Sequence, residues 1–250
     1  MPGIRSTYET DLLRVDDILL QMCDLADSTM RDATTALVER DVSLAEQVID
    51  RDRHLDMLHQ GLENRLLRVI ARWSPVARDL RTLLAALRVG ADLARMGGLS
   101  RHVAELARRR YPRCAAPGAS HVLVLSMGQV GGRLATMTRD LLEARDLRLV
   151  RQVAALDDQM DSLHRKLLAT LIAPDWPHGV EPAVDLTLVG RFYERYGDHT
   201  VTIAHQVHFI ETGALPEPRP REAIDVRVPT TTSTISSPVV HRAVRQPVER

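Results

Sequence analysis

Three pairs of acidic residues stand four positions apart in segments that we expect to be helical. This spacing places both carboxylates of a pair on one face of a helix, one turn apart. Two anions so placed repel each other, which costs roughly a few tenths of a kcal/mol unless a positive charge neutralises them. A hard metal cation neutralises them well, because carboxylate oxygens are among its preferred ligands. The pairs are Asp52 and Asp56, Asp157 and Asp161, and Glu194 and Asp198.

Such pairs also arise by chance on the solvated faces of helices, since 26% of the residues are charged. Their recurrence argues against chance, because the text that begins at Asp41 reappears at Asp146. A repeat of this kind predicts a duplicated unit of about 100 residues. The matched positions include Asp52 and Asp157, Asp56 and Asp161, and His59 and His164.

A second repeated segment differs between the two copies in its acidic residues. The segment 94–98 reads Ala-Arg-Met-Gly-Gly, and its counterpart at 194–198 reads Glu-Arg-Tyr-Gly-Asp. The second copy therefore has acids, Glu194 and Asp198, where the first copy has Ala94 and Gly98. Asp92 does not replace them, because two positions correspond to roughly 200° around a helix. We expect the second unit to bind metal, and the first to bind it weakly or not at all.

The two segments share a glycine and an arginine. Gly97 and Gly197 fall inside expected helices, where glycine costs about 1 kcal/mol relative to alanine. We therefore expect a neighbouring helix or a ligand to approach closely at both positions. Arg95 and Arg195 could bind a phosphate or a carboxylate through two parallel hydrogen bonds, or could simply pair with local acids.

Apolar residues recur at helical spacing along most of the chain, which predicts an all-α fold. Breaks at Asp41, at Ser74-Pro75 and at the loop 174–179 divide it into six long helices. Each half is then an antiparallel three-helix bundle, and the two bundles are related by pseudo-symmetry. The predicted helices cover 8–39, 41–73, 76–110, 121–143, 146–172 and 182–211.

These helices predict the domain organisation. The first repeat spans 1–111, a linker with Pro and Gly spans 112–120, and the second repeat spans 121–215. Residues 216–250 contain six prolines and a run of Thr and Ser, so we expect a disordered tail there.

Composition excludes some functions and favours one compartment. The 33 basic and 33 acidic residues balance, and aromatic residues make up 3%, so nucleic-acid binding is not expected. Cys23 and Cys114 are isolated, which indicates a reducing environment. Because no apolar run is long enough to span a bilayer, we expect a cytoplasmic protein that could dock on a membrane complex.

The text Glu-Arg-Tyr-Gly-Asp at 194–198, in a duplicated three-helix unit, resembles the Glu-Arg-x-Gly-Asp signature of the PhoU family. The start of the second helix, Arg40–Ala45, is also similar, and the stretch Leu188–Arg195 resembles the actinobacterial branch. The resemblance implies a non-enzymatic regulator that represses phosphate uptake and phosphate-starvation signalling. Its implied partners are the ATPase of a phosphate ABC transporter and a sensor histidine kinase, and it is expected to form a homodimer.

The resemblance further implies a metal ion, which is iron, manganese, magnesium or zinc in different members. Transferred to this chain, its acidic ligands are Asp157, Asp161, Glu194 and Asp198, with Asp52 and Asp56 as a degenerate set in the first bundle. Two alternatives remain open. Asp56-x-x-His59 and Asp161-x-x-His164 resemble half-sites of a carboxylate-bridged di-iron or ferritin-like oxidase. A metal-free helical scaffold would need none of the carboxylates.

Overall fold

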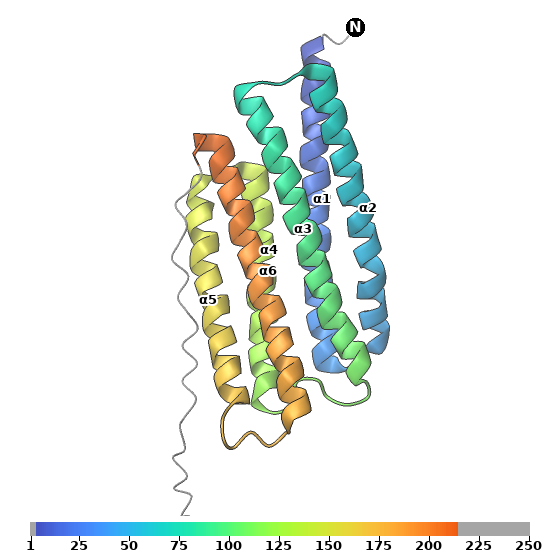
Figure 1. Ribbon diagram of the computed structural model, residues 1–250, viewed down its shortest axis with the longest axis vertical. Helices are drawn as coiled ribbons and strands as arrows, with labels where there is room; N and C mark the ends of the chain where they lie inside the picture. Colours follow the sequence, from blue (N-terminus) through green and yellow to red (C-terminus); the bar gives the residue numbers. More distant parts are fainter. Residues whose placement is uncertain (1–3, 215–250) are drawn as a thin grey trace, which may run out of the picture.

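The computed structural model describes residues 4–214, and this part of the chain folds into long α-helices joined by short connections (Figure 1). The all-α prediction with six helices is confirmed. The helices are α1 (Ile4–Glu39), α2 (Val42–Trp73), α3 (Ala77–Arg110), α4 (Ala119–Ala144), α5 (Leu147–Leu171) and α6 (Val180–Thr212).

The second helix of each repeat begins with an aspartate cap, as the sequence predicts for Asp41. The side chain of Asp41 accepts a hydrogen bond of 2.9 Å from the backbone amide of Leu44. Asp146 accepts one of 2.9 Å from the amide of Arg148. Each such cap stabilises a helix by about 0.5–2 kcal/mol, because it satisfies an amide that has no partner inside the helix.

Three helix starts differ from the prediction by two residues or more. Helix α1 begins at Ile4 rather than at Tyr8, and α4 begins at Ala119, inside the predicted linker. Helix α6 begins at Val180, because Pro182 is tolerated in a first turn whose amides lack helical partners anyway. The predicted tail at 216–250 lies outside the described residues.

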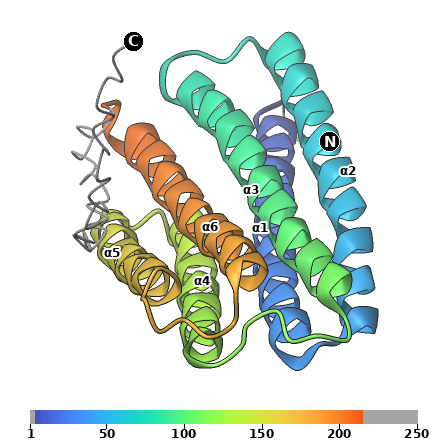
Figure 2. The same ribbon diagram turned by 60° about the horizontal axis from the view of Figure 1, so that its bottom comes forward.

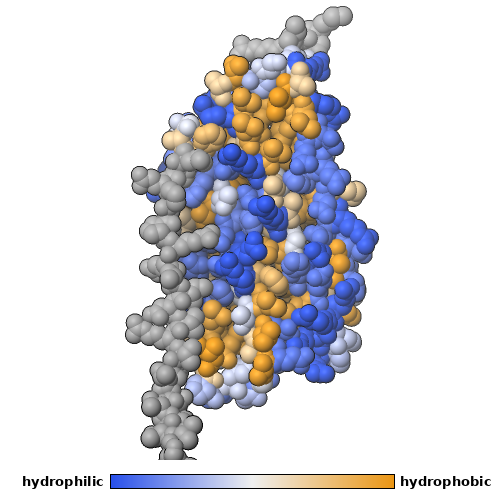
Figure 3. Space-filling model, viewed as in Figure 1, coloured by the Kyte–Doolittle hydropathy of each residue, from blue (hydrophilic) through white to orange (hydrophobic). Residues whose placement is uncertain are grey.

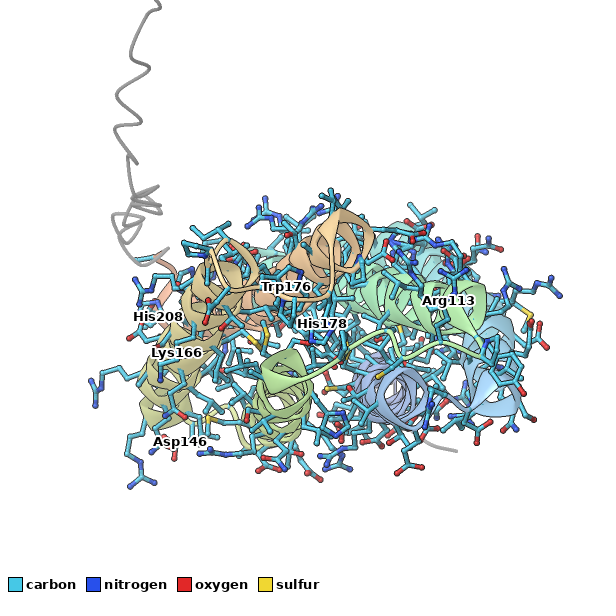
Figure 4. The ribbon with its side chains drawn as sticks, turned by 90° about the horizontal axis from the view of Figure 1, so that it is seen from below. Arg113, Asp146, Lys166, Trp176, His178 and His208 are labelled. Carbon is cyan, nitrogen blue, oxygen red and sulfur yellow. The ribbon has the colours of Figure 1, made fainter. Side chains whose placement is uncertain are left out.

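Helices α1–α3 form one bundle and α4–α6 form the other, as Figure 2 shows. The bundles meet where α1 packs on α4 and α3 packs on α6. Helices α2 and α5 lie on opposite flanks and make no contact with each other (Figure 4). Each flanking helix therefore faces only its own bundle, and α2 and α5 carry the first pair of acids in each repeat.

Two buried tyrosines of α6 hydrogen-bond to α1 and so fix the rotation of α6 about its axis relative to the first bundle. Tyr193 and Tyr196 are fully buried. The hydroxyl of Tyr196 donates a 3.1 Å hydrogen bond to the carbonyl of Ala26, and that of Tyr193 lies 2.7 Å from the hydroxyl of Thr34. Buried hydroxyls without partners are costly, so these bonds specify one rotation of α6. That rotation determines where Glu194, between the tyrosines, points.

Candidate metal centre

Asp157 of α5 lies directly opposite a glycine of α6. A Cβ atom added to Gly197 would lie 2.2 Å from Oδ1 of Asp157, far inside van der Waals contact. Only glycine therefore leaves room for this carboxylate, which explains why α6 accepts the helical cost of Gly197. The close approach predicted at Gly97 and Gly197 is confirmed, since an added Cβ on Gly97 would lie 2.2 Å from Leu55.

The carboxylate of Asp157 is not neutralised by the protein. Its Oδ1 atom is buried and accepts no hydrogen bond from any described residue. Burial, followed by repulsion from Asp161, Asp198, Asp158 and Glu194, raises the pKa of Asp157 to about 7. Both causes disfavour the ionised form of this carboxyl. A positive charge at this position is thus missing from the described residues.

The other predicted ligands are near enough to act on one another. Burial, then the charge of Asp198, raises the pKa of Asp161. The same two causes raise the pKa of Glu194. The acids of α5 and α6 are therefore close enough for each to raise the pKa of its neighbours across the interface of these two helices.

Two arginines that were not predicted lie near this group, since Arg165 and Arg191 both oppose the rise in the pKa of Asp161. Arg191, one turn before Glu194 on α6, forms an ion pair with it and lowers its pKa in opposition to burial. The side chain of Arg191 is 47% exposed, whereas that of Glu194 is 13% exposed. The i, i+3 spacing on a helix could have indicated this pair from the sequence. Arg191 partly compensates the acids without contacting Asp157.

The acids do not form a closed cage. Among residues 4–214, no three Asp, Glu, His or Cys side chains come together closely enough to hold a metal ion. Hard oxygen donors, excess negative charge and a buried oxygen without a partner fit a cation, but its ligands would have to rotate inward. The predicted residues thus fit a metal by chemistry and charge, while coordination geometry is not assembled.

In the first bundle, an arginine pairs with the aspartate that corresponds to Asp157. Asp52 stands over Gly97 as Asp157 stands over Gly197, with its Oδ1 3.5 Å from an added Cβ. Its Oδ2 lies 2.7 Å from Nε of Arg101, and Arg101 also pairs with Glu105 at 2.6 Å. Burial raises the pKa of Asp52, and Arg101 opposes this shift.

The remaining predicted positions of the first bundle do not add ligands. Asp56 is exposed, and the sequence has Ala94 and Gly98 where α6 has acids. A Cβ added to Gly98 would meet nothing within 4 Å. The space that Asp198 occupies in the second bundle is therefore open in the first.

Asp92 of the first bundle contacts the other bundle, so it does not replace the acids that are missing at positions 94 and 98. Its carboxylate lies 2.9 Å from Nδ1 of His199 on α6, and both side chains are largely buried. Arg95 lies 3.9 Å from Asp92 with a side chain that is 68% exposed. Arg195 is exposed on α6. The face of α3 and α6 is hydrophilic across its middle, between hydrophobic patches toward the two ends (Figure 3).

The histidines of the predicted half-sites do not meet. His59 is on α2 and His164 is on α5, and these helices make no contact. The ring of His164 packs against Gly190, where an added Cβ would lie 2.9 Å from its Cδ2 atom. A single di-iron centre of the ferritin type needs ligands that converge from facing helices. The arrangement of α2 and α5 does not support the oxidase alternative.

Fold and site together define a tandem pair of three-helix domains, with a group of mutually repelling acids in the second domain that arginines compensate only in part. The PhoU domain family matches residues 19–107 and 124–207. The chain belongs to the PhoU family.

Its relatives cover nearly all of the described residues. The chain is 40% identical over 213 residues to phosphate-specific transport system accessory protein PhoU homolog 2 of Mycobacterium bovis, spanning 85% of this chain and 100% of that protein. It is 39% identical to homolog 1 of Mycobacterium leprae, over 86% and 96% of the two chains. These relatives are accessory proteins and the family is not enzymatic, which confirms the prediction that the chain is not an enzyme.

Solved structures show the same fold. The crystal structure of PhoU from Pseudomonas aeruginosa superposes with a TM-score of 0.77 at 27% identity, covering 83% of this chain and all of that one. The phosphate transport system regulatory protein PhoU of Streptococcus pneumoniae superposes with a TM-score of 0.76 at 21% identity, covering 84% of this chain. Within residues 4–214, none of the helices has a stretch apolar and long enough to cross a bilayer.

Proposed function

We propose that this protein is a negative regulator of phosphate uptake that links a phosphate ABC transporter to a sensor histidine kinase in the cytoplasm. The observation that supports this most is the 40% identity to a protein named as an accessory of phosphate-specific transport, over the whole length of that protein. The protein carries no chemistry of its own in this proposal. It acts by binding one state of the transporter more tightly than another, because only differential affinity couples two partners.

A deletion strain tests the regulatory role. Without the gene, a reporter of phosphate starvation should be active even in phosphate-rich medium, and the full-length gene should silence it. A pull-down from phosphate-replete cells should recover the transporter ATPase and the kinase. A reporter that stays silent in the deletion strain would contradict the proposal.

We propose further that the second bundle holds a divalent or trivalent cation through Asp157, Asp161, Glu194 and Asp198. The support is the buried oxygen of Asp157 that lacks a partner, together with the raised pKa of three of these acids. Bound there, the cation would supply positive charge that ties α5 to α6. Iron, manganese, magnesium and zinc all remain candidates, and oxygen ligands suit magnesium and manganese well.

Elemental analysis of the purified full-length protein separates this site from a metal-free scaffold. We expect one metal ion for each chain after dialysis against Mn²⁺ and then against metal-free buffer. A protein that retains no metal, and whose thermal unfolding is unchanged by Mn²⁺, would identify the scaffold alternative. Analytical ultracentrifugation of the same sample tests the expected homodimer.

A further inference from the structure

A second charged cluster lies far from the acids, where α1 begins and α2 ends at the same end of the molecule (Figure 1). It lines a cleft of about 360 Å³ between these two helices. A volume of this size is at the lower end of the range for small-molecule sites, which is about 300–1,000 Å³. The lining residues are Asp11, Arg14, Arg65, Arg68, Val69 and Arg72.

One carboxylate organises this cleft without neutralising it. Asp11 accepts a 3.2 Å hydrogen bond from Arg65 and a 3.1 Å hydrogen bond from the indole nitrogen of Trp73. The side chains of Asp11 and Arg65 are 16% and 24% exposed, so this pair forms a half-buried wall. Val69, which is 2% exposed, lies at the base. Only one of the four arginines is compensated by Asp11.

The other three arginines keep their charge available. Within the described part of the chain, Arg14, Arg68 and Arg72 have no acidic partner. Arg68 donates through Nε to the carbonyl of Asn64 at 3.2 Å, which orients its terminal nitrogens. The guanidinium of Arg72 lies 4.8 Å from the centre of the Trp73 ring. These contacts orient the side chains of Arg68 and Arg72. Neither the hydrogen bond nor the stacking on Trp73 neutralises the charge of the guanidinium group.

Like charges on one helix face repel each other. Arg65, Arg68 and Arg72 follow one another at i, i+3 and i+7 on α2, so their charges share one face, and Arg14 faces them from α1. The dipole of α2 favours a cation in its last turn and accounts for Arg72 alone. The excess positive charge is compensated best by an oxyanion with several negative charges, because guanidinium groups donate paired hydrogen bonds to its oxygens.

We propose that the cleft between α1 and α2 binds a multiply charged phosphate-type anion, with Arg14, Arg68 and Arg72 as its donors and Asp11 as the positioning group for Arg65. A phosphate group of this kind can belong to a small molecule such as pyrophosphate or to an anionic lipid headgroup. The site is separate from the acids of α5 and α6 and does not depend on metal binding.

Titration calorimetry of the full-length protein with pyrophosphate tests the proposal. EDTA is kept in the buffer, so that metal bound at the acids cannot carry the anion. We expect binding to the wild type and a dissociation constant about 10-fold or more weaker for Arg68→Gln/Arg72→Gln, because charge-assisted hydrogen bonds are lost. Glutamine keeps helix propensity close to that of arginine, so the variant should retain its circular dichroism.

The matched control is Arg133→Gln/Arg151→Gln, which removes two exposed arginines of the second bundle. It should bind pyrophosphate like the wild type. Equal weakening in both double variants would overturn the site, because it would show a general effect of net charge. Failure of the wild type to bind, or equal competition by an acidic peptide of glutamates, would overturn it also.

A vesicle assay separates the two sources of phosphate. Vesicles of phosphatidylcholine with phosphatidic acid should sediment the protein through the same arginines if the natural ligand is a headgroup. Pyrophosphate binding without vesicle binding assigns the cleft to a small anion. Loss of neither interaction in Arg68→Gln/Arg72→Gln would contradict the proposal in both forms.

Discussion

Both bundles place an aspartate beside a glycine of their third helix, closer in the second bundle than in the first, and the charges around the two aspartates differ. In the first bundle, Arg101 of α3 reaches across and pairs with Asp52. In the second, the equivalent carboxylate, Asp157, has a buried oxygen without a partner and faces more acids on α6. The two copies therefore share an aspartate beside a glycine but differ in the charges around it. The first bundle pairs its aspartate with an arginine of the same bundle, and we propose that the second obtains positive charge from a bound cation.

The difference has a simple physical reason. A carboxylate that is taken partly out of water needs a compensating charge or it shifts its pKa upward. Arginine is always charged, so Arg101 opposes the upward shift of the pKa of Asp52 at every pH and without any ligand, although burial still raises that pKa on balance. In the second bundle, Arg191 and Arg165 oppose the rise in pKa of Glu194 and Asp161, but no basic side chain of the described residues opposes the rise at Asp157. If a cation binds there as proposed, the stability of the second bundle should depend on metal and on pH more than that of the first.

The largest effect should come from Asp157→Asn. We expect Mn²⁺ affinity to fall by at least about 100-fold. Loss of a residue that only hydrogen-bonds to a metal ligand already lowers affinity by about 10- to 100-fold, and Asp157 is proposed as a ligand itself. Asp52→Asn, at the equivalent place in the first bundle, is the matched control and should leave the affinity unchanged. Titration calorimetry of both variants measures the contrast. Equal losses in both would remove the distinction between the bundles.

The pH dependence of the metal-free protein should also separate the two bundles. The folded-state pKa of Asp157 is about 7, above its unfolded value near 4. Between these values the folded state binds the extra proton, so the free energy of unfolding should fall as pH rises from about 4 to about 7. Urea denaturation with EDTA at a series of pH values measures this.

Asp157→Asn should flatten that pH profile, and saturating Mn²⁺ should restore stability to the wild type at pH above about 7. The Asp52→Asn variant should retain most of the profile. A wild-type stability that rises steadily with pH through the same window would show that the Asp157 carboxyl is already compensated.

A smaller loss of stability is expected for Arg101→Val, which copies the residue at the equivalent position of α6. Removing the partner of Asp52 should lower the free energy of unfolding by about 1–2 kcal/mol, since the pair is partly exposed and partly buried. Arg101→Lys keeps the charge and should lose less. Urea denaturation at pH 7 compares the three proteins, and an unchanged midpoint for Arg101→Val would contradict the role assigned to Arg101.

The smallest effect is a gain of function in the first bundle. The triple variant Ala94→Glu/Gly98→Asp/Arg101→Val copies the acids of α6 and removes the internal cation. Position 98 has open space for a side chain. We expect a second, weak site for Mn²⁺, visible as an additional binding event in titration calorimetry. Unchanged stoichiometry would mean that the second bundle differs from the first by more than Glu194, Asp198 and the absence of an arginine at position 201.

The helix ends and the acidic pairs were predictable from the sequence because both depend on local pattern, whereas three helix starts were misplaced. The break at Asp41 and the i, i+4 spacing each involve neighbours on one helix. The sequence predicts that some group packs closely against Gly197, because glycine inside a helix is costly unless a neighbour needs the space. Its partner could not be identified, since that depends on how α5 packs on α6.

Specific contacts between helices could not be predicted from the sequence. Arg101 is seven positions from Ala94, and nothing in its own segment indicates that it reaches Asp52 on α2. Asp92 was expected to point away from the acids, but its pairing with His199 in the other bundle follows only from the packing of α3 on α6. The basic cleft likewise combines Arg14 with residues of α2 that are distant in sequence.

A crystal structure of the protein soaked with Mn²⁺, with anomalous scattering measured, tests the central claim most directly. One anomalous peak is expected between α5 and α6, within ligand distance of Asp157, and none between α2 and α3. A peak at Asp52, or no peak near Asp157 at saturating Mn²⁺, would contradict the division of roles between the two bundles.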